Sequence, residues 1–218
     1  MSLSASLDSV IAAAGALDKL DPWVWQTITA GAASARHPFH VGAFVSGTFI
    51  SKEHGDPPGT TPVQPTARMV VLRRSDRETR SLDLFTDRRS QKAKHVESNS
   101  VGQWLFWDRG SRVQFRISGS CHLITSGDEI ESVWQSIPVP QRSDYLSQSP
   151  PGSKWSGPKP PNQNEIASID TSDGRYFGIL RLRAQHVDVL YLRRDGHVRA
   201  GLQYADDGSL TNVSWLIP

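Results

Sequence analysis

The sequence of 218 residues is poor in several features, and each shortage excludes a class of protein. Its one cysteine, Cys121, allows neither an intrachain disulfide nor a thiolate metal cluster, so we expect a reducing compartment, the cytoplasm. No window approaches the roughly 18 uninterrupted apolar residues that a membrane span needs, which predicts a soluble protein with no membrane partner. The 24 Lys and Arg residues barely exceed the 22 Asp and Glu residues, so the net charge of +2 predicts no nucleic-acid partner.

What the chain does contain indicates a folded protein with one main domain. Hydrophobic residues make up 37% of it, and seven tryptophans are spread from Trp23 to Trp215, a composition that argues against disorder. The apolar stretch 10–17 follows no Lys or Arg, so we interpret it as part of an amphipathic helix and not as a secretory signal. We predict an N-terminal helix within residues 1–20 and a domain over residues 21–218.

Four helices and two long loops are expected. Residues 4–19 are rich in Ala and Leu, and Asp21 followed by Pro22 predicts an N-cap and a first helical residue for a second helix over 23–35. Ser90 is expected to cap a helix over 90–97, and the spacing of Ser126 and Glu129 predicts a capping box that opens a helix over 128–136. The Gly- and Pro-rich stretches 55–65 and 138–163 predict loops, the second a candidate lid.

The remaining segments carry strand-like patterns. Two of them, 67–73 and 81–86, are expected to pair as a hairpin, and residues 108–110 predict a turn. Many short strands with helices before and between them favour a mainly β fold with flanking helices, a closed or partly closed antiparallel barrel. The predicted strands are 41–49, 67–73, 81–86, 102–107, 113–125, 176–183, 186–192, 198–204 and 210–216.

The densest polar information lies between residues 68 and 94, where nine basic residues meet four acidic ones. Arg68 opens a predicted strand and Lys92 a predicted helix, with the hydroxyls of Thr86 and Ser90 between them in sequence. Guanidinium, ammonium, hydroxyl and free helix N–H groups are the donors that bind a phosphate. The alternative is a solvated hairpin edge.

An ordered set of short motifs gives this stretch a resemblance to a known family. The motifs are Arg68-Met-Val-Val-Leu-Arg73, Phe85-Thr86, Ser90-Gln-Lys-Ala-Lys94, Gln114 on a strand that ends in Gly119, and the ending Trp215-Leu-Ile-Pro218. Together they resemble the pyridoxamine 5'-phosphate oxidase family, closely over residues 41–125 and loosely over the C-terminal strands. The resemblance implies an antiparallel, Greek-key-like split β-barrel, a homodimer, and FMN bound between the two subunits.

The same resemblance implies an FMN site. Arg68 and Lys92 would face the phosphate, and Gln114 and Arg199 would approach the ring. The other implied cofactor residues are Met69, Val70, Val71, Leu72, Arg73, Phe85, Thr86, Ser90, Gln91, Gln148 and Ser149.

For a small-molecule substrate the family pattern points to Arg73, Arg142 and His197, with Ser143 beside Arg142, and it assigns no catalytic residue. A flavin supplies the redox chemistry itself, so a catalytic triad is not needed. The prediction is an FMN-dependent oxidoreductase whose substrate need not be pyridoxamine phosphate. The alternatives are a flavin carrier or sensor, a relative that binds deazaflavin or haem, and a barrel that has lost its cofactor.

Three further features are assigned structural roles. His37 and His40 flank Pro38 and are typical of a turn, so no metal site is predicted. Trp104, Phe106 and Trp107 on one strand are expected in the core or in a dimer interface. Cys121 is expected to be a buried, inert thiol.

Overall fold

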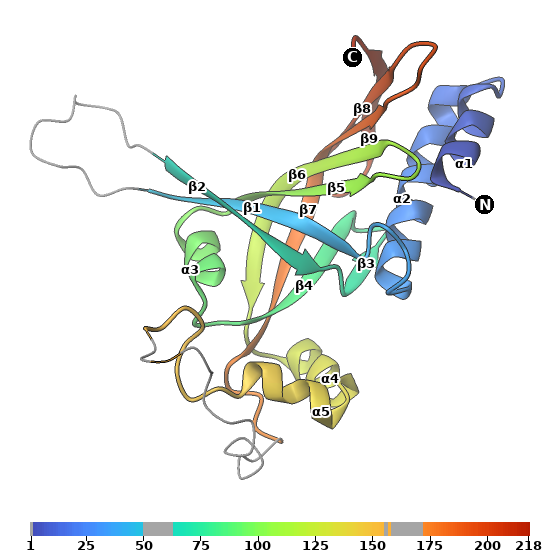
Figure 1. Cartoon of the computed structure of the whole chain (residues 1–218). Coiled ribbons are helices and arrows are strands. Elements are labelled where there is room, and N and C mark those ends of the chain that lie inside the picture. The colour runs from blue at the N-terminus through green and yellow to red at the C-terminus, as the bar shows by residue number, and fades with distance from the viewer. Residues whose placement is uncertain (1, 50–62, 155–156, 158–171) are drawn as a thin grey trace, which may run out of the picture.

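Nine antiparallel strands form one sheet in the computed structural model, which describes residues 2–49, 63–154, 157 and 172–218 (Figure 1). The order is β2-β1-β5-β6-β7-β4-β3, and β8 pairs with β7 and β9 with β8. The strands are β1 (Val41–Phe49), β2 (Val63–Val71), β3 (Arg74–Asp76), β4 (Ser81–Asp87), β5 (Val101–Asp108), β6 (Val113–Ile124), β7 (Phe177–Tyr191), β8 (Val198–Tyr204) and β9 (Leu210–Leu216).

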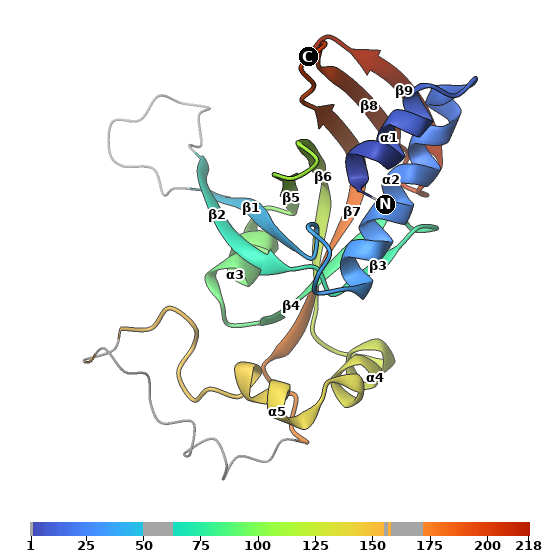
Figure 2. The ribbon, with the colours of Figure 1, turned by 45° about the vertical axis from the view of Figure 1, so that its right-hand side comes forward.

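Helices flank this sheet at three places. In both views α1 and α2 lie beside β8 and β9, whereas α4 and α5 lie at the opposite end of the molecule and α3 lies near β1 (Figure 2). The helices are α1 (Leu3–Ile11), α2 (Ala16–Ala33), α3 (Gln91–Ser98), α4 (Asp128–Ser136) and α5 (Val139–Arg142), with a 3-10 turn at Ser143–Tyr145. The predicted fold class, mainly antiparallel β with flanking helices, is confirmed.

The hairpin predicted between 67–73 and 81–86 is wrong. Strand β2 pairs with β1 from Val41 opposite Val71 to Phe49 opposite Val63, whereas β4 lies between β3 and β7. The hairpin to β4 is made instead by the short strand β3, from Arg74 opposite Asp83 to Asp76 opposite Ser81, within the segment that the sequence pattern assigned to the turn.

One long strand replaces the two predicted over 176–183 and 186–192. Strand β7 runs unbroken for 15 residues, but its pairing with β6 shifts between the two predicted strands: Ser118 stands opposite His186 and Gly119 opposite Ala184, so Gln185 of β7 is the extra residue of a β-bulge. A Cβ atom at Gly119 would lie 1.9 Å from the carbonyl oxygen of Arg183, so the backbones approach too closely there for any other residue.

The first two helices break earlier than predicted. The break lies before Gly15, which has a φ of 67°, and α2 then continues through Pro22. This helix crosses the predicted boundary between residues 20 and 21. The division into domains itself stays a prediction. Asp21 does not cap a helix because its buried carboxylate accepts from the Tyr204 hydroxyl at 2.8 Å and from Arg80 at 3.1 Å.

The predictions for α3 and α4 are correct in position but not in capping. Ser90 precedes α3, yet its hydroxyl lies 3.0 Å from the Thr86 hydroxyl and caps no backbone N–H. Gly127 precedes α4, and the Glu129 carboxylate pairs with arginines of the sheet in place of closing a capping box. Most of the predicted loop 55–65 lies outside the described residues. The predicted loop 138–163 contains α5 and the 3-10 turn at its beginning, and most of its last nine residues lie outside the described ones.

Two apolar clusters hold these elements together. The larger joins α2 to the barrel interior, where Trp23 of α2 lies edge-on to Phe115 of β6 with ring centres 5.4 Å apart. The smaller packs Trp134 of α4 and Tyr145 against Phe177 of β7. Cys121 is buried in the larger cluster, as predicted, and burial raises the pKa of its thiol to about 12. Among the described helices, none is long and apolar enough to cross a bilayer.

Candidate functional site

Arg68 lies on β2 with its guanidinium turned toward two hydroxyl groups. Its Nη1 donates to the Ser46 Oγ at 3.1 Å, and its Nη2 donates to the Thr66 Oγ1. The three side chains share one face of the sheet, because Thr66 and Arg68 are two residues apart on β2 and Thr66 stands opposite Ser46 of β1. Among the described residues no carboxylate pairs with Arg68.

Helix α3 adds two more basic side chains to this place. His95 Nδ1 lies 3.2 Å from the Thr66 Oγ1, and Lys92 lies one helical turn earlier on the same helix face. Burial lowers the pKa of Lys92 and of His95, and the positive charge of Arg68 lowers both further. We call Arg68, Lys92 and His95 the basic cluster.

The basic cluster suits an anion. Burial and mutual repulsion disfavour the charged forms of its members, with Asp87 as the opposing influence on Lys92. An anion among them relieves both costs, and Ser46 and Thr66 supply hydroxyls at the same place. Arg68 and Lys92 thus lie close enough for the charge of one to lower the pKa of the other, while their role in binding a phosphate stays a prediction.

The turn between β4 and α3 carries a second set of predicted residues. Thr86 and Ser90 are both buried and joined by their hydroxyls, and the Thr86 hydroxyl also lies 3.1 Å from the Asp87 carbonyl oxygen. Gln91, the first residue of α3, is exposed. The hydroxyl pair is therefore beside the N-terminus of α3 but within the protein interior.

Arg89 fastens the segment that contains Gln148 and Ser149 to this turn. Its Nη2 donates to the Ser147 carbonyl at 2.7 Å and its Nη1 to the Gln148 carbonyl at 3.1 Å. The same guanidinium pairs with Asp87 at 2.6 Å and lies over the Tyr176 ring, 3.4 Å from its centre. The hydrogen bond to Asp87 is the main reason that the pKa of Arg89 is raised. The predicted Gln148-Ser149 pair is thus held near α3 by its backbone, while both side chains are exposed.

The strand segment 69–73 leads from the basic cluster to a cavity. Met69 is exposed, Val70 and Val71 are half-buried, and Leu72 is fully buried. Arg73 and Phe85 then line a cavity of about 260 Å³ together with Arg74, Ser136, Ile137, Pro138, Gln141 and Tyr145.

Gln114 and Arg199 lie elsewhere in the same chain. Gln114 alternates with the buried Val113 and Phe115, so it faces outward from the barrel, whereas Arg68 stands in register with the buried Phe44. Gln114 pairs with Leu190 and Leu190 with Arg199, which places the two polar residues in one row on the outer face. Arg199 there binds Asp188 at 2.7 Å. Within one chain the structure separates this row from the basic cluster.

Two predicted substrate residues are not presented to the cavity. Arg142 is buried beneath the Trp134 ring, where its guanidinium donates to the carbonyls of Ile137 at 2.9 Å and Gln135 at 3.1 Å. His197 is exposed in the turn before β8. Arg142 supports the end of α4, and Arg73 alone of the three predicted substrate residues lines the cavity.

Sequence reasoning missed four residues of this region: Ser46, Thr66, Arg89 and His95. Two had a detectable signal, since Thr66 precedes Arg68 by two residues on a strand and His95 follows Lys92 by three on a helix. Ser46 had none, because its partner Arg68 lies 22 residues away, and nothing near Arg89 in sequence indicates that it holds the carbonyls of Ser147 and Gln148, 58 and 59 residues away.

Part of the sequence matches a known protein family. Residues 25–125 match the family described as pyridoxamine 5'-phosphate oxidase, FMN-binding domain. No curated protein matches the sequence significantly.

Solved structures extend the likeness to most of the chain. A pyridoxamine 5'-phosphate oxidase-related, FMN-binding protein from Nostoc punctiforme superposes with a TM-score of 0.69 at 20% identity, over 90% of this chain and 98% of that one. PhzG from Burkholderia lata, solved in complex with tetrahydrophenazine-1-carboxylic acid, gives a TM-score of 0.65 at 16% identity, over 92% of this chain and 91% of its own. These two show a common fold. Residues 25–125, fewer than half of the 218, therefore resemble the FMN-binding domain of the pyridoxamine 5'-phosphate oxidase family, and the chain has the split-barrel fold.

Proposed function

We propose that this protein is an FMN-dependent oxidoreductase that holds the FMN phosphate on the basic cluster. The observation that carries the proposal is the meeting of Arg68, Lys92 and His95, which have no carboxylate partner among the described residues. The positive charges of Arg68 and Lys92 repel each other in a partly buried place, which costs free energy unless an anion joins them, and His95, whose pKa is lowered, stands beside them as a mainly neutral hydrogen-bonding group. A phosphate, with its charge of about −2, is such an anion.

The strand that follows Arg68 supports the rest of the cofactor. From Arg68 to Arg73 an extended chain covers about 16 Å, enough to run beside a mononucleotide from its phosphate to its ring. Bound FMN would supply hydride and electron transfer. The chain's own part is to hold the phosphate with Arg68 and Lys92 and to leave the cavity beside Arg73 open to a substrate.

That cavity favours an oxidoreductase over a carrier or sensor, the second candidate. A carrier needs no space for a second molecule, whereas about 260 Å³ lined by Arg73, Phe85 and Tyr145 accommodates a small substrate. Turnover is tested by following the absorbance of the bound flavin with NADH, NADPH or oxygen as its redox partner. If no tested substrate reduces or oxidises the flavin, the result favours the carrier.

The cofactor is tested by the absorption spectrum of the purified protein and by chromatography of what it releases on heating. We expect flavin bands and free FMN. Arg68→Ala and Lys92→Ala should each weaken FMN binding at least tenfold, because each removes a charge-assisted contact to the phosphate. Lys94→Ala is the matched control, an exposed lysine on the same helix. Unchanged FMN affinity in both cluster variants would contradict the phosphate assignment.

We also propose a homodimer formed through the outer face of the sheet. Four apolar side chains are exposed on that face, Met69 by 67%, Trp107 by 43%, Val41 by 42% and Leu216 by 40%. Arg116 Nε and Asp188 Oδ1 on the same face are buried without a hydrogen-bond partner among the described residues. A second copy covering this face would bring its Gln114 and Arg199 toward the cofactor of the first, which accounts for their separation within one chain.

Sedimentation velocity tests the dimer. Trp107→Glu should yield monomers because it introduces a charge into the apolar face. Val139→Glu, at an exposed apolar residue of α5, should leave the association state unchanged. A wild-type monomer that binds FMN would overturn the proposal.

A further inference from the structure

The cavity beside Arg73 combines an apolar wall with a single guanidinium. Phe85 packs edge-on to Phe177 with ring centres 5.2 Å apart, and Tyr145 does the same at 5.3 Å. The guanidinium carbon of Arg73 lies 5.9 Å from the centre of the Phe85 ring. Two aromatic side chains held by a common neighbour make a firm apolar surface, and Arg73 stands at its edge.

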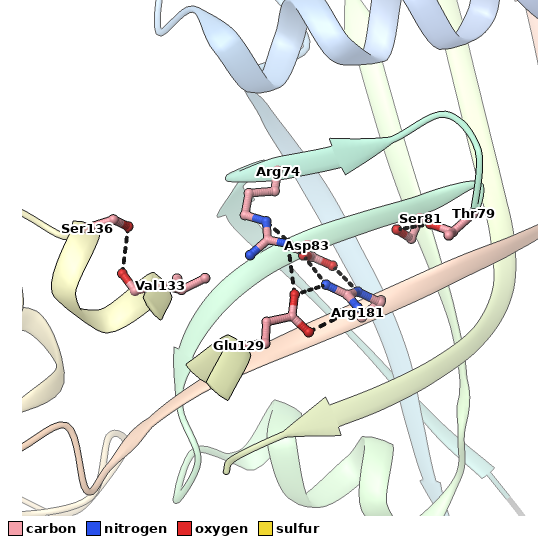
Figure 3. Close-up of polar contacts among 8 residues, drawn as sticks. All are labelled: Arg74, Thr79, Ser81, Asp83, Glu129, Val133, Ser136 and Arg181. Carbon is pink, nitrogen blue, oxygen red and sulfur yellow. Dashed lines mark hydrogen bonds and ion pairs between the residues drawn. The ribbon is translucent and has the colours of Figure 1, made fainter. Parts of the chain in front are cut away.

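Neutral hydrogen-bonding groups complete the lining. Burial raises the pKa of Tyr145, so its hydroxyl stays protonated at neutral pH. The positive charge of Arg73 lowers the same pKa, which shows that the two groups lie near each other. Gln141 adds an amide, whereas the Ser136 hydroxyl already donates to the Val133 carbonyl at 2.7 Å and can only accept (Figure 3). The cavity thus offers Arg73 as a cation and the Tyr145 hydroxyl and Gln141 amide as uncharged donors.

The ion pairs next to the cavity fix its net charge. Arg74 also lines the cavity, but it lies 2.8 Å from Glu129 and 3.5 Å from Asp83. Arg181 binds the same two carboxylates at 2.7 and 2.8 Å, and all four side chains converge from β3, α4, β4 and β7 (Figure 3). Arg73 forms no ion pair among the described residues, so the charges of these five side chains, three guanidinium groups and two carboxylates, sum to +1. Asp144, whose charge acts on the Tyr145 hydroxyl, and the buried Arg142 beside Ile137 add one charge of each sign and leave this sum unchanged.

We propose that this cavity binds the carboxylate of a flat, largely apolar monoanion, with Arg73 as the residue that selects it. A guanidinium fork matches a carboxylate in shape, and the aromatic wall suits an apolar ring next to it. A phosphate monoester brings a charge of about −2 at neutral pH, which exceeds the one positive charge and adds repulsion from Asp83 and Glu129. The inference rests on the proposed function, because it names the substrate class of the same site.

Calorimetric titration of the FMN-supplemented protein with benzoate, phenyl phosphate and benzyl alcohol tests the inference. We expect benzoate to bind more tightly than the other two. In protein saturated with FMN, Arg73→Met should weaken benzoate binding about tenfold or more, because a charged hydrogen-bond donor is lost. Arg77→Met, at an exposed arginine of the β3–β4 turn, is the matched control and should bind benzoate as the wild type does.

A second variant tests the charge argument separately. Glu129→Gln raises the net charge beside the cavity to +2, so it should improve phenyl phosphate binding more than benzoate binding. Equal benzoate affinity in wild type and Arg73→Met, stronger binding of phenyl phosphate by the wild type, or no benzoate binding would each overturn the inference. Benzoate binding that depends on Arg73 in a protein unable to bind FMN would uphold the cavity assignment and refute the FMN function.

Discussion

The contacts of Arg89 allow the loss of stability in an Arg89→Ala variant to be predicted quantitatively. The Arg89 guanidinium joins the β4–α3 turn to Tyr176, the residue before β7, and to the segment 147–148. The Asp87 side chain that it pairs with is only 3% exposed, and Arg89 itself is 18% exposed. Arg89→Ala therefore leaves a buried carboxylate without its cation and two carbonyl groups without their donor.

The expected loss of unfolding free energy is about 3 kcal/mol, the lower end of the cost of breaking a buried ion pair. The lower end applies because the backbone N–H of residue 89 still donates to Asp87 Oδ1, at 2.7 Å, in the alanine variant. Equilibrium urea denaturation measures the loss. Arg88→Ala is the control, an exposed neighbour whose side chain should contribute within about 0.5 kcal/mol.

Hydrogen exchange separates the clamp from a general loss of stability. If Arg89 holds the segment, backbone amides of residues 146–154 in Arg89→Ala should lose protection before those of β6 and β7 do. A loss below about 1 kcal/mol, or unchanged protection of residues 146–154, would refute the reasoning that this guanidinium fixes the segment.

Three further predictions concern stability and reactivity. The hydrogen bond from Arg181 is the main cause of the lowered pKa of Glu129, so the stability that the ionised carboxylate contributes is complete above its ordinary pKa of about 4.5 and is lost as pH falls through the lower folded value. In Glu129→Gln the free energy of unfolding in urea should therefore change less between about pH 5 and pH 3 than in the wild type. The same pH dependence in both proteins would contradict this. Gly119→Ala should cost about 1–3 kcal/mol in urea denaturation because its Cβ meets the Arg183 carbonyl, and an unchanged midpoint would show that the strands can move apart. Cys121, buried and with a pKa of about 12, should react with iodoacetamide at pH 8 far more slowly in the native protein than in urea, and equal rates would mean that the thiol is exposed.

Local patterns predicted the individual elements better than their pairing. Alternation along the chain was enough to find β1, β5, β6, β8 and β9 within a residue or two. It did not reveal that β4 pairs with β7, since Ser81 and Arg183 are about a hundred residues apart and nothing local records that partnership.

Side-chain competition explains the misplaced helix caps. Asp21 and Glu129 have the chemistry and spacing of capping residues, but Tyr204 and Arg80 take the first and Arg74 and Arg181 take the second. A buried ion pair or hydrogen bond outweighs an exposed cap, and which one forms depends on residues distant in sequence.

The basic cluster could be foreseen in part because its two main members come from short, well-marked elements. Arg68 lies on a strand and Lys92 on a helix, and sequence patterns predict both elements. That the two side chains face the same phosphate was implied by the family resemblance. The outward direction of Gln114 and Arg199 required the observed register of β6, β7 and β8.

The length of β7 has a consequence for how the protein comes to be folded. This strand is bonded to β4, β6 and β8, so the pairing that unites the early and late halves of the sheet awaits residues 177–191. During synthesis on the ribosome, β4 and β6 emerge long before their shared partner and present open edges meanwhile. Folding that depends on such distant contacts is slow, and a chain truncated before residue 177 should accumulate as an aggregation-prone intermediate.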